Sequence, residues 1–255
     1  MILILLLSML LFTACSHPRQ ARANVPPPPA AETSPASEPQ PNPSIPATPE
    51  TRVSAAPKAT TDLAAPSLPA DARPLATETG FASWYGPPYH NRRGSNGEIY
   101  NMNAMTAAHR TYPLGSIVRV TNVKTGHTAL VRITDRGPFI PGRIVDLSLA
   151  AARRVDIVQP GVAEVKVELM QSGAPLDSAG KWAVQIGGFP DEKSATELAD
   201  HLTRRYRTAK VLRFASPAGD WWIRVRVLDD DHERAQQLAA ETATPEGAVF
   251  LVRLD

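Results

Sequence analysis

Hydrophobic and polar residues divide the chain into stretches of different character. Residues 2–12 form a nearly unbroken apolar run, and residues 16–79 contain 15 of the 25 prolines and no Phe, Trp or Tyr. Strand-like and helix-like patterns begin near residue 80 and continue to the C-terminus. A proline-rich segment without aromatic residues buries too little apolar surface to offset its ordering entropy, so we expect folded structure only after it.

The pattern between residues 80 and 171 is typical of short β-strands. Residues 117–120 and 128–133 are rich in β-branched side chains, and residues 124–127 between them predict a hairpin turn. Residues 164–169 alternate strictly between apolar and polar, which predicts a half-buried last strand.

One short helix is predicted in the same region, over residues 148–154, with Asp146 or Ser148 as its N-cap. Short strands joined by glycine and proline corners, together with one short helix, favour a small β-barrel. Residues 172–178 are predicted to be a linker.

Residues 179–255 contain the order strand, helix, strand twice. The expected elements are strand 181–187, helix 191–206, strand 210–214, strand 221–227, helix 231–242 and strand 248–253. In the first helix Ala195, Leu198, Ala199 and Leu202 share one face. This βαββαβ order predicts a four-stranded antiparallel sheet with both helices on one face.

The N-terminal apolar run is too short to span a bilayer and fits the core of a signal peptide. Thr13 and Ala14 precede Cys15, the only cysteine, and this pattern resembles a bacterial lipobox, in which the cysteine is lipidated. Residues 1–15 are therefore expected to be a lipoprotein signal peptide, and an ordinary secretory signal is the alternative. By resemblance to enterobacterial sorting rules, Ser16 implies the outer membrane.

The segment of residues 16–79 is expected to be a disordered linker. Its prolines favour polyproline II, which would reach on the order of 200 Å at about 3.1 Å per residue if fully extended. It is interpreted either as a tether between a membrane anchor and folded domains or as a tail without a required length.

Charge separates the two folded regions. Residues 80–170 carry eleven Lys or Arg against six Asp or Glu, and residues 171–255 carry eleven against thirteen. No basic run or arginine-rich helix is present, which argues against a nucleic-acid partner. The spacing of the six histidines does not suggest metal ligands, and Cys15 is expected to be lipidated, so no metal or other cofactor is predicted.

Three residues in the first region are candidates for chemistry. Glu98 follows a turn at Asn96 and Gly97, and Asp135 ends a predicted strand. Two separated carboxylates suit acid–base cleavage of a glycosidic bond. His109 could react directly or position an acid. The alternatives are a turn-capping Asp135 and a solvated Glu98.

Further candidates for substrate binding lie near these residues. Asn96 belongs to the turn before Glu98. Trp84 and Tyr85 could stack on a sugar or pack in the core. Arg132 and Arg136 could bind carboxylates of a glycan or lower the pKa of the nearby Asp135.

Several motifs together resemble the rare lipoprotein A family. They are Gly80-Phe-Ala-Ser-Trp-Tyr-Gly-Pro, Asn96-Gly-Glu, Leu114-Gly, Val118-Arg-Val-Thr-Asn, Asp135-Arg-Gly-Pro-Phe and Gly142-Arg-Ile-Val-Asp-Leu-Ser. The resemblance implies a six-stranded double-psi β-barrel over residues 80–171, related to barwin and expansins. It also implies endolytic cleavage of peptidoglycan strands, preferably peptide-free ones.

The resemblance implies a definite chemistry. A lytic transglycosylase cleaves the MurNAc–GlcNAc bond without water, because the muramic C6 hydroxyl attacks and closes a 1,6-anhydro ring. Asp135 matches the family's catalytic aspartate and Glu98 its second essential acid. One acid can suffice, since the attacking hydroxyl belongs to the substrate.

The second region resembles a ferredoxin-like SPOR domain, which binds peptide-free glycan at the division septum. Gln185, Trp222 and Arg224 match positions on the family's open sheet face. Gly188 stands where a polar residue is common, and Leu228-Asp229 replaces the usual Gly-Pro.

The expected function is therefore septal peptidoglycan cleavage by a lipid-anchored protein facing the periplasm. The alternatives are a non-catalytic glycan-binding or wall-loosening lipoprotein, and a scaffold for division-site proteins.

Overall fold

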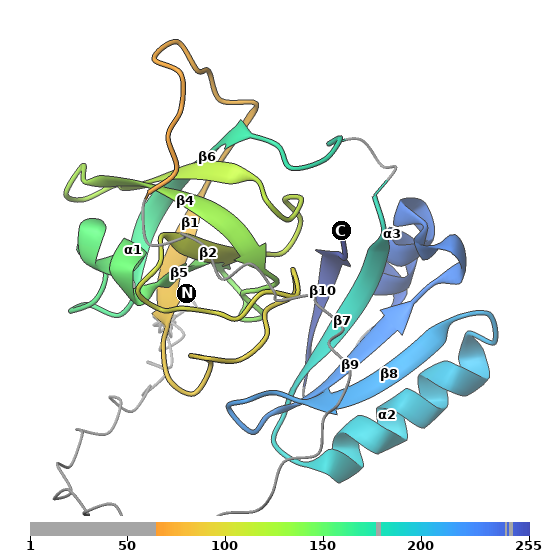
Figure 1. Cartoon of the computed structure of the whole chain (residues 1–255). Coiled ribbons are helices and arrows are strands. Elements are labelled where there is room, and N and C mark those ends of the chain that lie inside the picture. Colours follow the sequence, from red (N-terminus) through yellow and green to blue (C-terminus); the bar gives the residue numbers. More distant parts are fainter. Residues whose placement is uncertain (1–64, 177–179, 243, 245–246) are drawn as a thin grey trace, which may run out of the picture. The chain divides into compact units, whose positions relative to one another are not determined.

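The computed structural model describes residues 65–176, 180–242, 244 and 247–255. Two regions contain the helices and strands of the described residues (Figure 1). The expected signal peptide, Cys15 and residues 16–64 of the expected linker lie outside this part of the chain. Every helix in the described part is too short or too polar to reach across a bilayer.

Six strands close into a barrel in the order β1-β5-β2-β4-β3-β6. The elements are β1 (Ala76–Tyr85), β2 (Thr106–His109), β3 (Ile117–Asn122), β4 (Thr128–Asp135), β5 (Arg143–Ser148), α1 (Leu149–Arg154) and β6 (Ala163–Gln171). β1 is parallel to β5 and β2 to β4, and the other neighbours are antiparallel. The predicted six-stranded double-psi barrel is confirmed.

Alternate residues of the strands fill the barrel interior. The fully buried aliphatic side chains include Val118, Val120, Val131, Ile133, Val145, Leu147, Val165, Val167 and Leu169. The residues between them point to the outer surface, because successive side chains of a strand face opposite sides. Polar side chains such as Arg119 of β3, Arg132 of β4 and Glu168 of β6 are therefore found on the outer surface.

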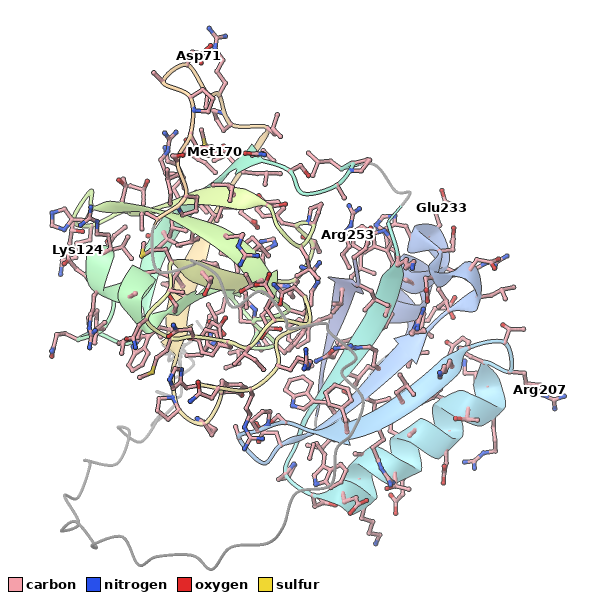
Figure 2. All side chains as sticks on the ribbon, viewed as in Figure 1. Asp71, Lys124, Met170, Arg207, Glu233 and Arg253 are labelled. Atoms are coloured by element: carbon pink, nitrogen blue, oxygen red, sulfur yellow. The ribbon has the colours of Figure 1, made fainter. Side chains whose placement is uncertain are left out.

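The predicted hairpin joins β3 to β4. The Asn122 side chain accepts the backbone N–H groups of Lys124 at 2.9 Å and Thr125 at 3.3 Å. Gly126 has a φ of 75°, a left-handed conformation that glycine adopts without strain. Figure 2 shows the Lys124 side chain leaving the barrel at this turn.

Of the two expected caps of α1, the structure selects Ser148: its hydroxyl accepts the Ala151 N–H at 3.2 Å and donates to the Ala104 carbonyl at 2.6 Å. One boundary in this region needs correction. The barrel begins at Ala76 rather than at residue 80, because Ala76 pairs with Leu169 in the β1–β6 ladder. The expected boundary followed the first aromatic residue, Phe81, whereas the ladder starts at residues 76–79, which include no aromatic residue.

The second region is a four-stranded antiparallel sheet in the order β10-β7-β9-β8. Its elements are β7 (Trp182–Phe189), α2 (Glu192–Arg205), β8 (Lys210–Ala215), β9 (Trp221–Arg226), η1 (Leu228–Asp230), α3 (His232–Glu241) and β10 (Ala248–Arg253). Both α-helices pack on the sheet face formed by Val184, Ile186, Ile223 and Val225. The predicted βαββαβ fold is confirmed.

The helices begin where the sequence indicated. Asp191 caps α2 by accepting the Ser194 N–H at 2.9 Å, and Asp231 caps α3 by accepting the Arg234 N–H at 2.8 Å. Ala195 and Leu202 of α2 are buried against the sheet, as the helical pattern predicted. Leu228 and Asp229, which stand where Gly-Pro was expected, belong to η1, and Asp229 has a φ of 61°.

Candidate active site

Asp135 stands at the end of β4, and three donors converge on one of its carboxylate oxygens. Its Oδ1 accepts the backbone N–H groups of Ser95 at 3.0 Å and Arg136 at 2.8 Å, together with the Ser95 hydroxyl. Backbone N–H groups can only donate, so Oδ1 acts as an acceptor here. A proton carried by Asp135 would therefore sit on Oδ2.

The loop between β1 and β2 reaches across the end of β4 and forms a small pocket with it. The pocket is lined by Gly94, Asn96, Glu98, Ile99, Tyr100, Asn101, Ala104, Thr106, Arg132, Thr134 and Asp135. Glu98 and Asp135 thus lie on one face of the barrel, as a shared site requires. The pocket encloses about 40 Å³, enough for a few water molecules and too little for a sugar ring.

Glu98 is held by Arg132 of β4. The Arg132 guanidinium donates to both carboxylate oxygens of Glu98, at 2.8 and 3.4 Å. This hydrogen bonding lowers the pKa of Glu98 below its ordinary value. Glu98 is therefore ionised at neutral pH and offers a negative charge rather than a proton. Arg132, expected to bind substrate, lies in the pocket wall with its guanidinium paired to Glu98.

Asn96 shapes the turn that presents Glu98. Its side-chain oxygen accepts the Glu98 N–H at 3.0 Å, and its own backbone N–H donates to the Thr134 carbonyl at 3.2 Å. Gly97 between them has a φ of 86°, which favours glycine. Asn96 lines the pocket, so its position agrees with the expected substrate-binding role, although its side chain also has a local partner.

The two expected sugar-stacking residues occupy opposite sides of β1. Trp84 packs against the barrel core, which agrees with the core alternative for this residue. Tyr85 faces outward and stacks on Tyr100 with ring centroids 4.3 Å apart, while Tyr89 meets its ring edge-on at 5.9 Å. Neither residue belongs to the pocket lining, whereas Tyr100 does.

His109 lies at the end of β2 and is buried outside the pocket lining. Its Nδ1 accepts the N–H groups of Thr111 at 3.2 Å and Tyr112 at 2.9 Å, so the ring proton is on Nε2. That nitrogen donates to Glu78 at 2.6 Å. Burial lowers the pKa of His109, which keeps the ring neutral. The ring nitrogens are thus taken up by Glu78 and two backbone N–H groups rather than by Asp135 or Glu98, so these contacts support neither the direct role nor the positioning of a candidate acid.

Arg136 follows Asp135, but its side chain turns away from the pocket. The guanidinium donates to the backbone carbonyls of His109 at 3.0 Å and Tyr112 at 2.7 Å. Its contribution to the pocket is the backbone N–H that donates to Asp135. The Arg136 side chain instead ties the segment after β2 to the end of β4. The structure thus does not bring this side chain to the expected substrate-binding position.

The three candidates in the second region share the sheet face opposite the helices. Gln185 of β7 pairs in register with Arg224 of β9, and the Arg224 guanidinium donates to the Gln185 side chain at 2.7 Å. Arg224 also lies over the Phe214 ring at 5.4 Å. Trp222 pairs with Gly187, where a Cβ atom would come within 2.3 Å of the indole ring. A glycine is needed there to seat the indole.

Three residues that build the pocket carry little signal in the sequence. Ser95 donates twice to Asp135, Tyr100 lines the wall and Thr106 lies at the start of β2. Ser95 directly precedes the Asn96-Gly97 turn, and this turn is the sequence feature that could have pointed to Ser95. Among the described residues, no group of three or more His, Cys, Asp or Glu could hold a metal ion.

Comparison with known proteins agrees with this geometry. Residues 77–167 match the family model described as lytic transglycolase, and residues 178–249 match the SPOR domain model. The barrel thus matches a lytic transglycolase model, and the second sheet matches a SPOR model. The resemblance to the rare lipoprotein A family is confirmed at the level of these domains and of the relatives.

Relatives of this chain carry the name endolytic peptidoglycan transglycosylase RlpA. The Vibrio cholerae protein is 52% identical over 133 residues, which cover 49% of this chain and 51% of the relative. The Neisseria meningitidis serogroup B protein is 47% identical over 132 residues, covering 51% and 55%. The Helicobacter pylori J99 protein is 41% identical over 151 residues, covering 48% of each. The chain spans about half the length of these relatives.

The ion pair between Arg132 and Glu98 leads to a testable expectation. Arg132→Gln should raise the pKa of Glu98 toward its ordinary value of 4.5, because the main cause of its lowering is lost. The measurement is an NMR titration of the Glu98 side-chain carboxyl carbon.

Arg119→Gln is the matched control, since Arg119 of β3 pairs with Glu168 at 2.8 Å. That variant should raise the pKa of Glu168 and leave Glu98 unchanged. An unchanged Glu98 pKa in Arg132→Gln would contradict the assigned pairing.

Proposed function

We propose that this chain is a lytic transglycosylase that cleaves MurNAc–GlcNAc bonds of peptidoglycan and leaves 1,6-anhydro-muramic ends. The observation that carries the proposal is one pocket lined by two carboxyl groups in different environments. Asp135 is fixed through Oδ1, and Glu98 is paired with a guanidinium. The names of the relatives support the same substrate.

Asp135 is the proposed proton-transfer group. Oδ2 gives a proton to the leaving glycosidic oxygen as the C1–O4 bond breaks. The same atom then takes the proton of the muramic C6 hydroxyl as the O6–C1 bond forms. The enzyme returns to its starting state, and no enzyme nucleophile is needed.

Glu98 is proposed to act through its charge. It stays ionised beside Arg132, so its negative charge can stabilise the oxocarbenium character that develops at C1. Because the pocket is smaller than a sugar, a glycan strand would lie across its mouth and present only the scissile bond to the carboxyl groups.

The SPOR domain is proposed to hold peptide-free glycan on the sheet face opposite its helices. Arg224, kept in place by Gln185, supplies hydrogen-bond donors, and Trp222 supplies a flat apolar surface for a sugar ring. We further propose that this binding concentrates the protein at the septum, where division-site proteins are potential partners.

The N-terminal segment supports a proposed location. Lipidation of Cys15 would anchor the protein in the envelope facing the periplasm, and Ser16 favours the outer membrane. The residues between Cys15 and Ala76 would then tether the domains to their anchor.

Asp135→Asn should abolish release of 1,6-anhydro-muramic fragments from amidase-treated sacculi, lowering the rate by about 10²–10⁴-fold. The amide keeps the shape of the side chain but transfers no proton. The measurement is mass spectrometry of the released fragments. Asp156→Asn, at an exposed carboxylate that pairs with His127, is the control and should retain full release. If the unaltered protein binds sacculi but releases no 1,6-anhydro-muramic fragments, the proposed activity is refuted.

Glycan binding by the SPOR domain can be separated from cleavage by working in an Asp135→Asn background. Adding Arg224→Gln should weaken pelleting with peptide-free sacculi roughly tenfold, as loss of a central arginine contact does. Arg213→Gln is the control, because Arg213 pairs with Glu192 of α2 on the helix-covered face. If the Arg224→Gln and Arg213→Gln variants pellet equally, the assignment of the glycan-binding face is contradicted.

Lipidation is tested at the N-terminus. Mass spectrometry of the protein isolated from membranes should find a diacylglyceryl group on Cys15, and Cys15→Ser should release the protein into the soluble fraction. Ser16→Asp should keep the lipid and move the protein to the inner membrane. An unmodified Cys15 in the membrane-isolated protein would refute the anchor.

A further inference from the structure

A small hairpin within the loop between β1 and β2 borders the pocket. Arg93 and Ile99 face each other in this hairpin as an isolated antiparallel bridge. The backbone hydrogen bonds of the bridge join the residues on either side of this pair, each with an N···O distance of 2.8 Å. Neither Arg93 nor Ile99 has a role in the proposed function.

Arg93 and Ile99 thus occupy a non-hydrogen-bonded position of the hairpin. Side chains at such a position share one face and lie closer together than at the hydrogen-bonded positions. Ile99 is 55% exposed and belongs to the pocket lining, so it stands at the rim of the pocket. The exposed Arg93 side chain therefore lies beside Ile99 at this rim, where a glycan strand across the mouth would pass.

The positive charge of Arg93 is not used within the described part of the chain. Its guanidinium donates to the Gly97 carbonyl, and every ion pair among the described residues involves another cation. A guanidinium has five N–H donors in a planar fork that matches a carboxylate. Arg93 is therefore a cation held at the rim with donors left for an anionic group of the substrate.

The charges of the pocket lining direct such an anionic group outward. Of the described residues that line the pocket, Arg132 is the only cation, and its guanidinium donates to both carboxylate oxygens of Glu98. Asp135 adds a second acid to the lining. An anionic substituent would be repelled by these acids, whereas it would be attracted to Arg93 at the rim.

Arg93 is also close to the carboxyl group that is proposed to react. A Cβ atom on the next residue, Gly94, would lie 3.6 Å from Asp135 Oδ2, the oxygen proposed to carry the proton. Muramic acid carries its lactyl group on C3 of the same ring whose C1–O4 bond is cleaved. A cation at this rim is therefore in place for a substituent of the ring that reacts.

We propose that Arg93 binds the lactyl carboxylate of the muramic residue at the cleavage site, and that Ile99 packs against the methyl group of the same substituent. This carboxylate is free only where the stem peptide has been removed, because the peptide is joined to it through an amide bond. Arg93 is thus a specificity-determining residue for peptide-free strands. The inference rests on the proposed lytic transglycosylase function and names the substituent that the site recognises.

The test compares two soluble substrates with the full chain. One is peptide-free glycan with free lactyl carboxylates, and the other is the same glycan with these carboxylates converted to methylamides. With the free carboxylates, Arg93→Gln should raise KM for anhydro-product release about five- to tenfold and keep kcat within about twofold, since the contact is equal in the ground and transition states. With the methylamides, the variant should match the unaltered protein. An equal effect on both substrates, or no effect on either, would overturn the inference.

Arg92→Gln is the matched control. Arg92 is the exposed neighbour of Arg93, its side chain donates to the Pro88 carbonyl at 2.9 Å, and it points to the other face of the hairpin. Its removal should leave KM unchanged, whereas a rise as large as in Arg93→Gln would show a general effect of charge and contradict the assignment. Arg93→Lys keeps the charge and should recover part of the loss, and a variant as weak as Arg93→Gln would also contradict it.

A binding measurement separates this inference from the proposed function. In Asp135→Asn, which should not cleave, the methyl NMR signals of Ile99 should shift on titration with a peptide-free tetrasaccharide of alternating GlcNAc and MurNAc. The shift should disappear when Arg93→Gln is added and when the methylamide of the tetrasaccharide is used. No shift at Ile99 overturns the inference whether or not the protein cleaves glycan. A carboxylate-dependent shift without anhydro product from the unaltered protein would refute the proposed activity and support carboxylate binding by Arg93.

Discussion

The double pairing of β2 is the constraint on which the rest of the barrel site depends. This strand has four residues, all of them buried, and it lies parallel to β4 and antiparallel to β5. Both ladders meet at Ala108, which places Asp135 and Asp146 on its two sides. A Cβ atom on Gly137 would lie 3.7 Å from the Ala108 methyl group, so the backbone after Asp135 also packs against this residue. A larger side chain at position 108 would disturb both aspartates at once.

The same short stretch of barrel gives three carboxyl groups three different environments. Glu98 is exposed and paired with Arg132, so it remains charged. Asp135 accepts three hydrogen bonds on one oxygen and keeps the other for the pocket chemistry that we propose. Asp146 is enclosed, and its burial outweighs its partner Arg143. Separation of protonation behaviour among nearby acids is what acid–base chemistry at one pH requires.

Sequence patterns predicted the antiparallel parts well, because their signals are local. β-Branched side chains over residues 117–120 and 128–133 and alternation over residues 164–169 identified β3, β4 and β6, and the repeat after residue 179 identified the whole second sheet. The short strand β2 was harder. No strand was predicted over residues 106–109, since four buried residues show no alternation and their partners are distant in sequence.

The hydrogen-bond partners of the site residues could not be predicted from the sequence either, because they too are distant along the chain. Asp135 is bound by Ser95, forty residues earlier, and Glu98 by Arg132, thirty-four residues later. The sequence named Asp135 and Glu98 but could not show which donors they meet. It also left the role of His109 open, and the His109 ring contacts Glu78 and two backbone N–H groups rather than either candidate acid.

The loop of residues 86–105 explains how a closed barrel can carry a precise site. Closure leaves no free strand edge for a ligand, so the ligand must meet the outer surface and whatever covers it. Three links tie the loop to the last residues of β4: Glu98 to Arg132, Asn96 to the Thr134 carbonyl, and Ser95 to Asp135. Without them a loop of this length would have to be ordered at each encounter with substrate, which would weaken binding. With them the ordering takes place during folding, and the carboxyl groups are in place before a glycan arrives.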